Sequence, residues 1–336
     1  MNILFTCAGR RTYLLKYFKR ELAGDGLIIG ADMQLTAPAL SAADIKVSVP
    51  SVYDDNYINS ILDICSKYDV NLVISLNDLE LPILAKNKVL FEERNVFVLV
   101  SSNDVIDICF DKYKTYQYIC SLGLNSPKTY IRLEDAVNAL SHGEIKFPLI
   151  LKPRWGSGSI GIETVYDEDE LYIVYSLLKK KIKRTILSTV SQKDSDYVLI
   201  QQKISGQEFG LDIMNNFAGE NVAVSVKKKL SMRAGETDKA VIVDNHEVSN
   251  IGATIGTSLH HIGNLDCDIL EENGLYYVLE LNPRFGGGFP FSYEAGVNLP
   301  KAIIDWADGK PFDNLKLNPI IGKVFAKCDY LVDVTQ

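Results

Sequence analysis

The sequence predicts an α/β protein in which a doubly wound parallel sheet is followed by two α+β units. Three observations support this prediction. Strands alternate with amphipathic helices over residues 1–105, a loop rich in glycine and serine at 156–161 joins two strands, and an acidic strand pair occupies 264–282. Alternating strands and helices are typical of a parallel sheet that is covered by helices on both faces.

The composition is that of an ordinary globular protein and argues against several classes of function. The chain has 336 residues, 47% hydrophobic and 23% charged, a length that allows about two or three domains. Its net charge of -8 argues against a nucleic-acid partner, which normally requires a basic surface. The sequence has no secretory leader pattern and no apolar run of about 18 residues, so we expect a cytoplasmic protein without a membrane partner. The six cysteines include no C-x-x-C pair, which argues against a disulfide framework.

In the first unit, strands and helices are expected to alternate regularly. The expected strands are Ile3–Cys7, Leu27–Ala31, Leu72–Ser75 and Val96–Val100, and the expected helices are Arg11–Ala23, Asn56–Lys67 and Leu79–Glu92. Sheets of this kind bind ligands at the carboxyl ends of their strands. Arg10, Arg11 and Glu80 follow such strand ends, Glu80 within the polar run 77–80, and are therefore candidate contacts for a polar substrate.

A dinucleotide-binding sheet is the main alternative for this unit. Asp32 ends the second strand, where an acidic residue would hold the ribose of a dinucleotide. The first turn, Cys7-Ala8-Gly9-Arg10-Arg11, keeps only Gly9 of the G-x-G-x-x-G set. Because those glycines let the backbone approach the pyrophosphate, this turn disfavours binding of a nicotinamide cofactor.

The second unit carries a lysine directly before the glycine-rich loop. Lys152 ends an apolar strand at 147–153. The candidate loop residues that follow are Gly156, Ser157, Gly158, Ser159 and Gly161. Loops of this composition expose backbone amides that can contact phosphates. The order differs from that of a P-loop, in which glycines precede the lysine at the start of a helix.

The third unit contains an acidic hairpin that predicts a divalent metal site. An Asn-Gly dipeptide separates the two strands within 264–282, and this dipeptide is a strong hairpin signal. Glu280 and Asn282 are two residues apart in a strand and should project from the same face. The hairpin can fold Asp268 beside them, and two carboxylates with an amide oxygen suit Mg²⁺ or Mn²⁺. A solvated surface hairpin is the alternative, but Glu280 follows an apolar run, which disfavours it.

With these pieces in order, the chain resembles the ATP-grasp superfamily, close to its members that are like the large subunit of carbamoyl phosphate synthase. The resemblance covers nearly the whole chain and depends on the order and spacing of several short motifs. These motifs are Asp111-Lys112, Leu149-Ile150-Leu151-Lys152-Pro153, Gly156–Gly161, Gln201-Gln202 with Gly206-x-Glu208, and Asp268 with Glu280-Leu281-Asn282-Pro283-Arg284. The resemblance implies a pre-ATP-grasp domain, a linker helix with a small lid domain, and a larger C-terminal domain. Their expected boundaries are 1–110, 111–205 and 206–336.

The resemblance also implies a role for each matching residue. The implied ATP-binding residues are Lys112, Lys152, the loop 156–161, the hinge residues Gln201, Gln202, Lys203 and Ile204, and Glu208. The implied metal ligands are Asp268, Glu280 and Asn282, and the implied catalytic residues are Arg284 and Lys152. At the first hinge position, where this superfamily often has Glu, this chain has Gln201. Asp268 is shorter than the usual Glu or Gln, which leaves Asp266 as a rival ligand.

Members of this superfamily phosphorylate a carboxylate with ATP and let a nucleophile attack the acyl phosphate. The resemblance therefore implies an ATP- and Mg²⁺-dependent ligase that joins a carboxylate to an amine or ammonia and releases ADP and phosphate. The alternatives are carboxyphosphate or carbamoyl phosphate chemistry on bicarbonate, and a nucleotide-binding module without catalysis. A single ATP-grasp unit argues against complete carbamoyl phosphate synthesis, which uses two. Arg233, Glu236 and Asp238 are further candidate substrate contacts, and homodimer formation stays open.

Overall fold

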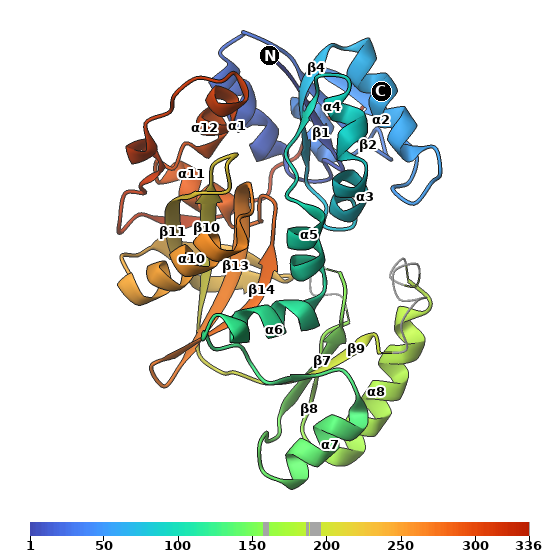
Figure 1. Ribbon diagram of the computed structural model, residues 1–336, viewed down its shortest axis with the longest axis vertical. Helices are drawn as coiled ribbons and strands as arrows, with labels where there is room; N and C mark the ends of the chain where they lie inside the picture. Colours follow the sequence, from blue (N-terminus) through green and yellow to red (C-terminus); the bar gives the residue numbers. More distant parts are fainter. Residues whose placement is uncertain (157–160, 186–187, 189–195, 336) are drawn as a thin grey trace.

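The computed structural model describes residues 1–156, 161–185, 188 and 196–335, and its strands form three separate sheets (Figure 1). A parallel sheet lies at one end of the molecule and a four-stranded sheet at the other, with a six-stranded sheet beside them. The mixed α/β class and the parallel N-terminal sheet predicted from the sequence are confirmed.

The first sheet has the strand order β3-β2-β1-β4-β5 and is parallel throughout. Its strands are β1 (Asn2–Thr6), β2 (Ile28–Asp32), β3 (Ile45–Ser48), β4 (Val70–Ser75) and β5 (Phe97–Val98). Its helices are α1 (Thr12–Leu22), the 3₁₀ helix η1 (Pro38–Ala42), α2 (Tyr57–Lys67), α3 (Leu81–Lys86) and α4 (Lys88–Glu92). Phe5 packs in one apolar cluster with Phe18 of α1, and Leu4 packs in another with Tyr57 of α2. Since successive strand residues point to opposite faces, helices cover both faces of this sheet.

Two features of this sheet differ from the sequence prediction. The short strand β3, in which Ile45 and Val47 alternate with polar residues, was not predicted. The helix expected at 79–92 is divided into α3 and α4 at Asn87. The side chain of Asn87 donates a hydrogen bond to the carbonyl of Ile83 at 2.8 Å. A local bond of this type competes with continuation of the helix.

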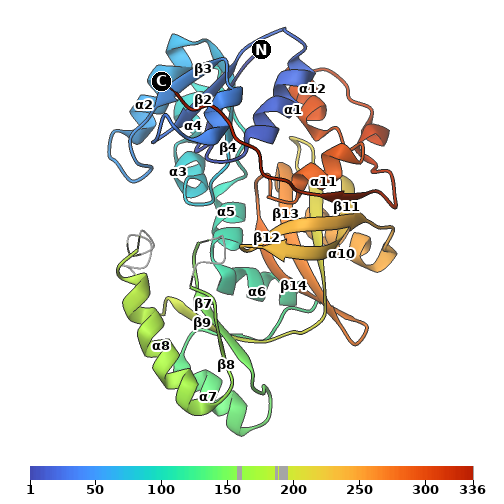
Figure 2. The same ribbon diagram turned by 180° about the vertical axis from the view of Figure 1, so that it is seen from behind.

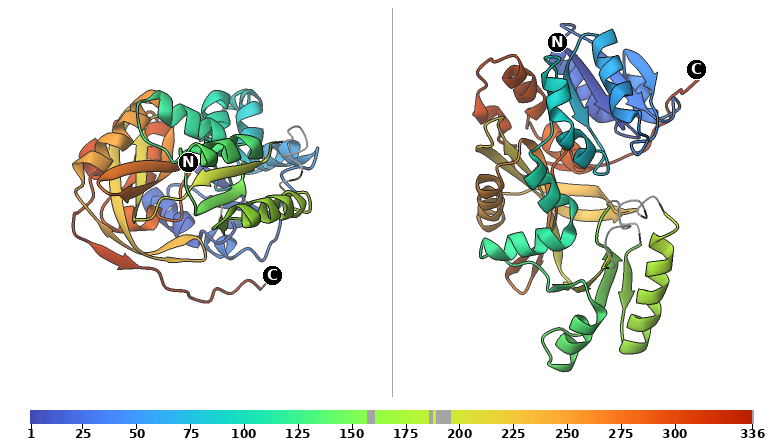
Figure 3. Two further views of the ribbon diagram at one scale, coloured as in Figure 1. Left: turned by 90° about the horizontal axis from the view of Figure 1, so that it is seen from below. Right: turned by 45° about the vertical axis from the view of Figure 1, so that its right-hand side comes forward.

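Two helices, α5 (Asn103–Phe110) and α6 (Lys112–Ser121), lead to a four-stranded antiparallel sheet of order β6-β9-β7-β8. Its strands are β6 (Thr129–Tyr130), β7 (Leu149–Pro153), β8 (Glu163–Val165) and β9 (Val198–Gln202), and its helices are α7 (Leu133–Ser141) and α8 (Glu168–Ile182). Leu149 and Leu151 pack with both helices in a separate apolar core. Lys152, the next residue of β7, therefore projects from the opposite face of the sheet. Figure 3 shows α8 running alongside the strands of this sheet.

The third sheet is six-stranded and antiparallel, with the order β14-β13-β10-β11-β12-β15. Its strands are β10 (Gln207–Asn215), β11 (Asn221–Arg233), β12 (Glu236–Ile242), β13 (Gly263–Glu272), β14 (Leu275–Asn282) and β15 (Val324–Ala326). The helical segments of this unit are α10 (His246–Leu259), α11 (Phe289–Glu294), α12 (Leu299–Ala307) and the 3₁₀ helix η2 (Asn314–Leu317). Helix α10 was not predicted from the sequence, and it packs on the apolar face of the sheet together with α5 and α6.

The parallel sheet and the six-stranded sheet share one apolar core. Phe18 of α1 and Met214 of β10 belong to the same buried cluster, and the rings of Phe18 and Phe285 meet edge to face at 5.9 Å. Tyr17 stacks on Tyr293 of α11 with a centroid separation of 3.7 Å. Figure 2 shows α1 beside α11 and α12. Within the described ranges, no helix is long and apolar enough to cross a membrane.

Candidate functional site

One face of the six-stranded sheet is apolar, and the other carries charged residues in transverse rows. Directly opposed residues on neighbouring strands lie on the same face of a sheet. One row consists of Lys227, Gly210, Asp268 and Glu280, and the next consists of Ser225, Asp212, Asp266 and Asn282. Cys267 points to the apolar face, where it is buried in the core with α5, α6 and α10. The predicted acidic hairpin therefore belongs to a larger polar surface.

Glu280 and Asn282 lie on this polar face, and Asn282 Nδ2 donates a hydrogen bond to Glu280 Oε1 at 3.3 Å. The pairing of β13 with β14 shifts register just before Glu280, which leaves Leu279 as an extra residue. Because of this bulge, Val278 and Leu281 both enter the apolar core although they are three residues apart. Bulges frequently redirect side chains next to active sites, and this one sets the direction of Glu280.

Asp268 lies directly across from Glu280 and is held by a buried lysine. Lys229 Nζ donates hydrogen bonds to Asp268 Oδ1 and to Glu208 Oε1, each at 2.7 Å. Burial, together with the neighbouring carboxylates Asp266 and Glu280, raises the pKa of Asp268 to about 7. Burial opposes the charge of Lys229, but its two carboxylate partners raise the pKa of Lys229 above its ordinary value.

Arg284 joins the acidic hairpin to the parallel sheet. Its Nη1 donates to Asp266 Oδ2 at 3.0 Å, and its Nη2 donates to Asp78 Oδ2 at 2.9 Å. Burial disfavours the guanidinium charge, but Asp78 and Asp266 raise the pKa of Arg284. Gly286 allows this approach, because a Cβ at that position would lie 2.1 Å from Asp266 Cγ. Each of the two candidate ligands on β13 therefore has a cationic partner.

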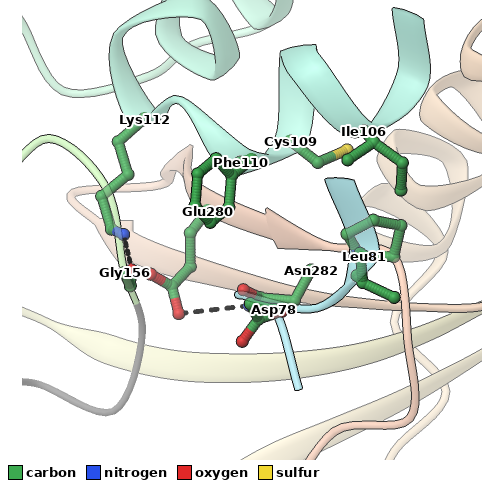
Figure 4. Close-up of a pocket in the computed structure, with 10 residues that line it drawn as sticks. Asp78, Leu81, Ile106, Cys109, Phe110, Lys112, Gly156, Glu280 and Asn282 are labelled. Carbon is green, nitrogen blue, oxygen red and sulfur yellow. Dashed lines mark hydrogen bonds between the residues drawn. The ribbon is translucent and has the colours of Figure 1, made fainter. Parts of the chain in front are cut away.

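Two lysines approach Glu280 from the small sheet and its linker helix. Lys152 is buried, and burial lowers its pKa to about 8 while Glu280 opposes this shift. Burial favours the protonated form of Glu280, but the charges of Lys112 and Lys152 lower its pKa below the ordinary value. Lys112, Glu280, Asn282 and Asp78 line one pocket, which Figure 4 shows with Gly156 at its edge. Two predicted phosphate-binding lysines and two predicted metal ligands are thus brought together.

The predicted glycine-rich loop is described at its two ends. The carbonyl of Gly156 accepts a hydrogen bond from Lys112 Nζ. Gly161 has a positive φ of +71°, and a Cβ there would lie 3.2 Å from Leu178 Cδ1 of α8. The predicted nucleotide contacts Ser157, Gly158 and Ser159 lie outside the described residues.

The predicted hinge Gln201, Gln202, Lys203 and Ile204 leads from β9 toward the six-stranded sheet. The side chain of Gln201 is buried and donates through Nε2 to Thr129 Oγ1 at 2.7 Å. At the end of the hinge, a Cβ on Gly206 would lie 1.9 Å from the carbonyl oxygen of Glu271. The side-chain amide of Gln201, which stands where Glu is frequent, therefore bonds within the small sheet. At position 206 the chain passes so close to β13 that only glycine fits.

Glu80, a predicted substrate contact, is instead a core residue of the parallel sheet. It is fully buried, and burial raises the pKa of its carboxyl group even though hydroxyl groups surround it. Its carboxylate accepts hydrogen bonds from Thr6 Oγ1 at 2.8 Å, Tyr57 OH at 2.6 Å and Ser75 Oγ at 2.6 Å. Within the polar run 77–80, Asp78 is the acid that reaches Arg284.

Three other predicted substrate contacts lie on the hairpin of β11 and β12. Arg233 Nε lies 3.1 Å from Asp238 Oδ1, and Arg233 Nη1 donates to Asp329 Oδ2 of the C-terminal segment at 2.6 Å. Glu236 Oε2 accepts from Lys327 Nζ of the same segment at 3.0 Å. The C-terminal segment therefore pairs with the residues that the sequence suggested for substrate binding.

Arg10 and Arg11, in the turn after β1, face the same hairpin. Burial opposes ionisation of Glu236, but Lys327 and then these two arginines lower its pKa. Tyr13 lies among them, and burial raises its pKa to about 12 while Arg11 opposes the shift. The turn is fixed by Gly9, whose amide donates to Asp32 Oδ2 at 2.9 Å. Asp32, which would hold the ribose in a dinucleotide-binding sheet, therefore fixes this turn instead.

Three charged residues of the polar face, Asp212, Lys227 and Lys229, were not predicted from the sequence. Lys227 Nζ donates to Asp212 Oδ2, and Ser292 Oγ donates to the same oxygen at 2.5 Å. Asn264 Nδ2 donates to Asp212 Oδ1 at 3.0 Å. An acid within an apolar strand and two lysines spaced by two, Lys227 and Lys229, were the available signals.

The donor atoms fit a divalent cation that arrives with a phosphate. Glu280 and Asn282 supply carboxylate and amide oxygens on one face, with Asp268 opposite. Among the residues that the structure describes, no three His, Cys, Asp or Glu side chains cluster as a metal site. Mg²⁺ is commonly held by one or two carboxylates together with substrate phosphates and water, which matches this arrangement better than an all-protein cage.

Two family models and several relatives match this chain. A family model for the PylC-like N-terminal domain matches residues 3–99, and a model described as ATP-grasp in the biosynthetic pathway with Ter operon matches residues 194–322. The large chain of carbamoyl phosphate synthase from Clostridium beijerinckii is 24% identical over 260 residues. That match covers 72% of this chain and 21% of the relative, so the chain spans about a fifth of the relative's length.

Solved structures of a biotin carboxylase domain and of an amino acid ligase have the same fold. The biotin carboxylase domain of 2-oxoglutarate carboxylase from Hydrogenobacter thermophilus, solved with MgADP, ADP and bicarbonate, superposes with a TM-score of 0.73 at 16% identity, covering 95% of this chain and 72% of that one. The L-amino acid ligase from Bacillus licheniformis superposes with a TM-score of 0.70 at 19% identity, covering 96% of this chain and 78% of that one.

Proposed function

Because the chain belongs to the ATP-grasp superfamily, we propose that it is an ATP- and Mg²⁺-dependent ligase that activates a carboxylate and releases ADP and phosphate. The acceptor would be a carboxylate oxygen, the intermediate an acyl phosphate, and the final nucleophile an amine or ammonia. The observation that carries this proposal is that Lys112 and Glu280, from two different elements, line one pocket, and that the charge of Lys152, from a third element, acts on Glu280.

The residues of the pocket suit transfer of the γ-phosphoryl group. Such transfer depends mainly on positioning and on neutralising charge that spreads over the phosphoryl oxygens. Lys112 and Lys152 would bind the phosphate chain, and Glu280 and Asn282 would hold Mg²⁺, which neutralises phosphate charge when bound. Arg284, fixed between Asp78 and Asp266, would face the transferred group.

The remaining assignments follow from the same proposal. The backbone of Gln201–Ile204 would contact the adenine, and Glu208 would lie on the nucleotide side of the metal ligands. The charges of Arg11, Glu236 and Arg284 all act on Tyr13. Arg11 and Glu236 would contact the substrates, since a carboxylate and an amine require opposite charges.

A bicarbonate acceptor is the second candidate. It is favoured by the similarity to a biotin carboxylase domain solved with bicarbonate. In this reaction the product of phosphoryl transfer would be carboxyphosphate, and the same lysines and metal ligands would serve. The two candidates therefore differ in the acceptor and not in the nucleotide site.

The deciding experiment measures the nucleotide product and traps the intermediate. The protein is incubated with MgATP, hydroxylamine and a panel of carboxylic acids, with bicarbonate as a separate arm. We expect ADP and a hydroxamate to form in step with one acid, and Lys152→Ala to abolish both. Lys146→Ala, an exposed lysine of the same unit, is the matched control and should retain activity. Release of AMP and pyrophosphate would overturn the proposal, and ADP formed only with bicarbonate would select the second candidate.

A further inference from the structure

Lys112 and Lys152 present a physical problem, because they are like charges that repel each other and Lys152 is buried. Lys112 begins α6 and Lys152 lies on β7, so their backbones belong to different elements. Each lysine would gain from moving apart or toward solvent. Something in the fold must therefore hold the start of α6 against the end of β7.

A buried ion pair lies at this junction. Arg154, two residues after Lys152, donates through Nε to Asp111 Oδ1 at 2.8 Å and through Nη2 to Asp111 Oδ2 at 2.7 Å. Arg154 is 9% exposed and Asp111, which directly precedes Lys112, is 3% exposed. Two parallel bonds of this kind fix orientation as well as distance. The pair thus joins the residue next to one lysine to the strand that carries the other.

Backbone and ring contacts tighten the same junction. The amide of Lys112 donates to the carbonyl of Arg154 at 3.1 Å, and Lys112 Nζ donates to the carbonyl of Gly156. The guanidinium of Arg154 lies 4.7 Å from the ring centroid of Trp155 and 5.9 Å from that of Tyr113. The side chain of Arg154 is therefore held on several sides and has little freedom to turn away.

Asp111 also fixes the first turn of α6. It is the N-cap residue, and its Oδ1 accepts from the amides of Tyr113 at 3.0 Å and Lys114 at 3.5 Å. The same carboxylate therefore sets the start of the helix and receives the arginine. A shift of the Asp111 carboxylate would therefore also shift Lys112, the next residue.

We propose that the Arg154–Asp111 pair is a positioning device that holds Lys112 and Lys152 in register for the polyphosphate of ATP. The role rests on the proposed function, since it assumes that these lysines bind the nucleotide. A buried ion pair is weak evidence for a contribution to stability, because desolvation offsets the attraction. Its bidentate geometry beside both lysines is better explained by orientation.

The test separates binding of the phosphate chain from binding of the nucleoside. Arg154→Lys keeps the charge but loses the planar fork. Asp111→Asn keeps an equally good N-cap but loses the charge. For each variant, the dissociation constants of MgATP and AMP are measured by calorimetry, together with the unfolding midpoint. Arg132→Lys is the matched control, because Arg132 forms the same fork with Asp135 at 2.8 and 3.1 Å on the exposed surface of the same unit.

We expect both variants to bind MgATP at least tenfold more weakly and to bind AMP within twofold of the wild type, and Arg132→Lys to bind both normally. Equal binding of MgATP by the wild type and Asp111→Asn would overturn the positioning role. Parallel loss of MgATP and AMP binding in a folded Asp111→Asn variant would also overturn it, because that result indicates general damage. A wild-type protein that fails to bind MgATP would instead reject the proposed function, and the role of the pair with it.

Discussion

His261 should make the stability of the C-terminal unit depend on pH. It is fully buried, and its Nε2 donates to the carbonyl of Ile213 at 3.0 Å. Burial lowers the pKa of His261 from 6.5 to about 4. The folded-state pKa lies below the unfolded value, so the neutral ring stabilises the fold above pH 6.5, and this contribution is lost as the pH falls toward 4. Between pH 7 and pH 5 the free energy of unfolding is expected to fall by about 2 kcal/mol, at about 1.4 kcal/mol for each unit of pKa difference.

The comparison variant is His261→Gln. Its amide can donate to the carbonyl of Ile213 but cannot titrate, so it keeps the hydrogen bond and removes the proton linkage. Urea unfolding at pH 7 and pH 5, followed by circular dichroism, gives the free energy of unfolding for both proteins. Between pH 7 and pH 5, the free energy of unfolding should fall by about 2 kcal/mol more for the wild type than for the variant, since the two proteins share every other titrating group. Identical losses in the two proteins would show that His261 is not the group responsible and would refute the reasoning.

Three further substitutions separate metal binding, ion-pair geometry and backbone fit. Glu280→Gln keeps the shape of the side chain but removes its charge, so MgATP turnover should fall at least a hundredfold with an unchanged unfolding midpoint; turnover near that of wild type would reject the metal assignment. Gly286→Ala places a Cβ 2.1 Å from Asp266 Cγ, a side chain that can shift, so we expect lost turnover with little loss of stability, checked by ADP release and thermal unfolding. Gly206→Ala places a Cβ 1.9 Å from the backbone carbonyl oxygen of Glu271, which cannot shift alone. The free energy of unfolding should therefore fall by roughly 1–3 kcal/mol, and an unchanged unfolding midpoint would contradict this expectation.

The sequence allowed prediction of the features that depend on local periodicity. Glu280 and Asn282 share a face because they are two residues apart, and Cys267 faces away from them for the same reason. The bulge at Leu279 was not predictable, because it depends on the register between two strands. The short strand β3 was missed, because four residues carry little periodic signal.

Contacts between distant parts of the chain were beyond prediction from the sequence. Arg284 bonds to Asp78 across 206 positions, and no local pattern marks that partnership. Glu80 and not Asp78 was predicted as a substrate contact, although both lie in the same polar run after a strand. Their separation into a site residue and a core residue depends on the hydroxyl groups that surround Glu80, and these come from three separate elements.

The apolar core shared by the parallel sheet and the six-stranded sheet limits how this protein can be recombined. A fragment ending at residue 110 would lose the partners of Phe18, among them Phe285, and would expose that surface to water. The unit at residues 129–202 has its own core, and its exchange would leave the shared cluster intact. Chimeras between ATP-grasp proteins should therefore accept a foreign small unit, whereas a foreign N-terminal sheet would need its matching C-terminal helices α11 and α12.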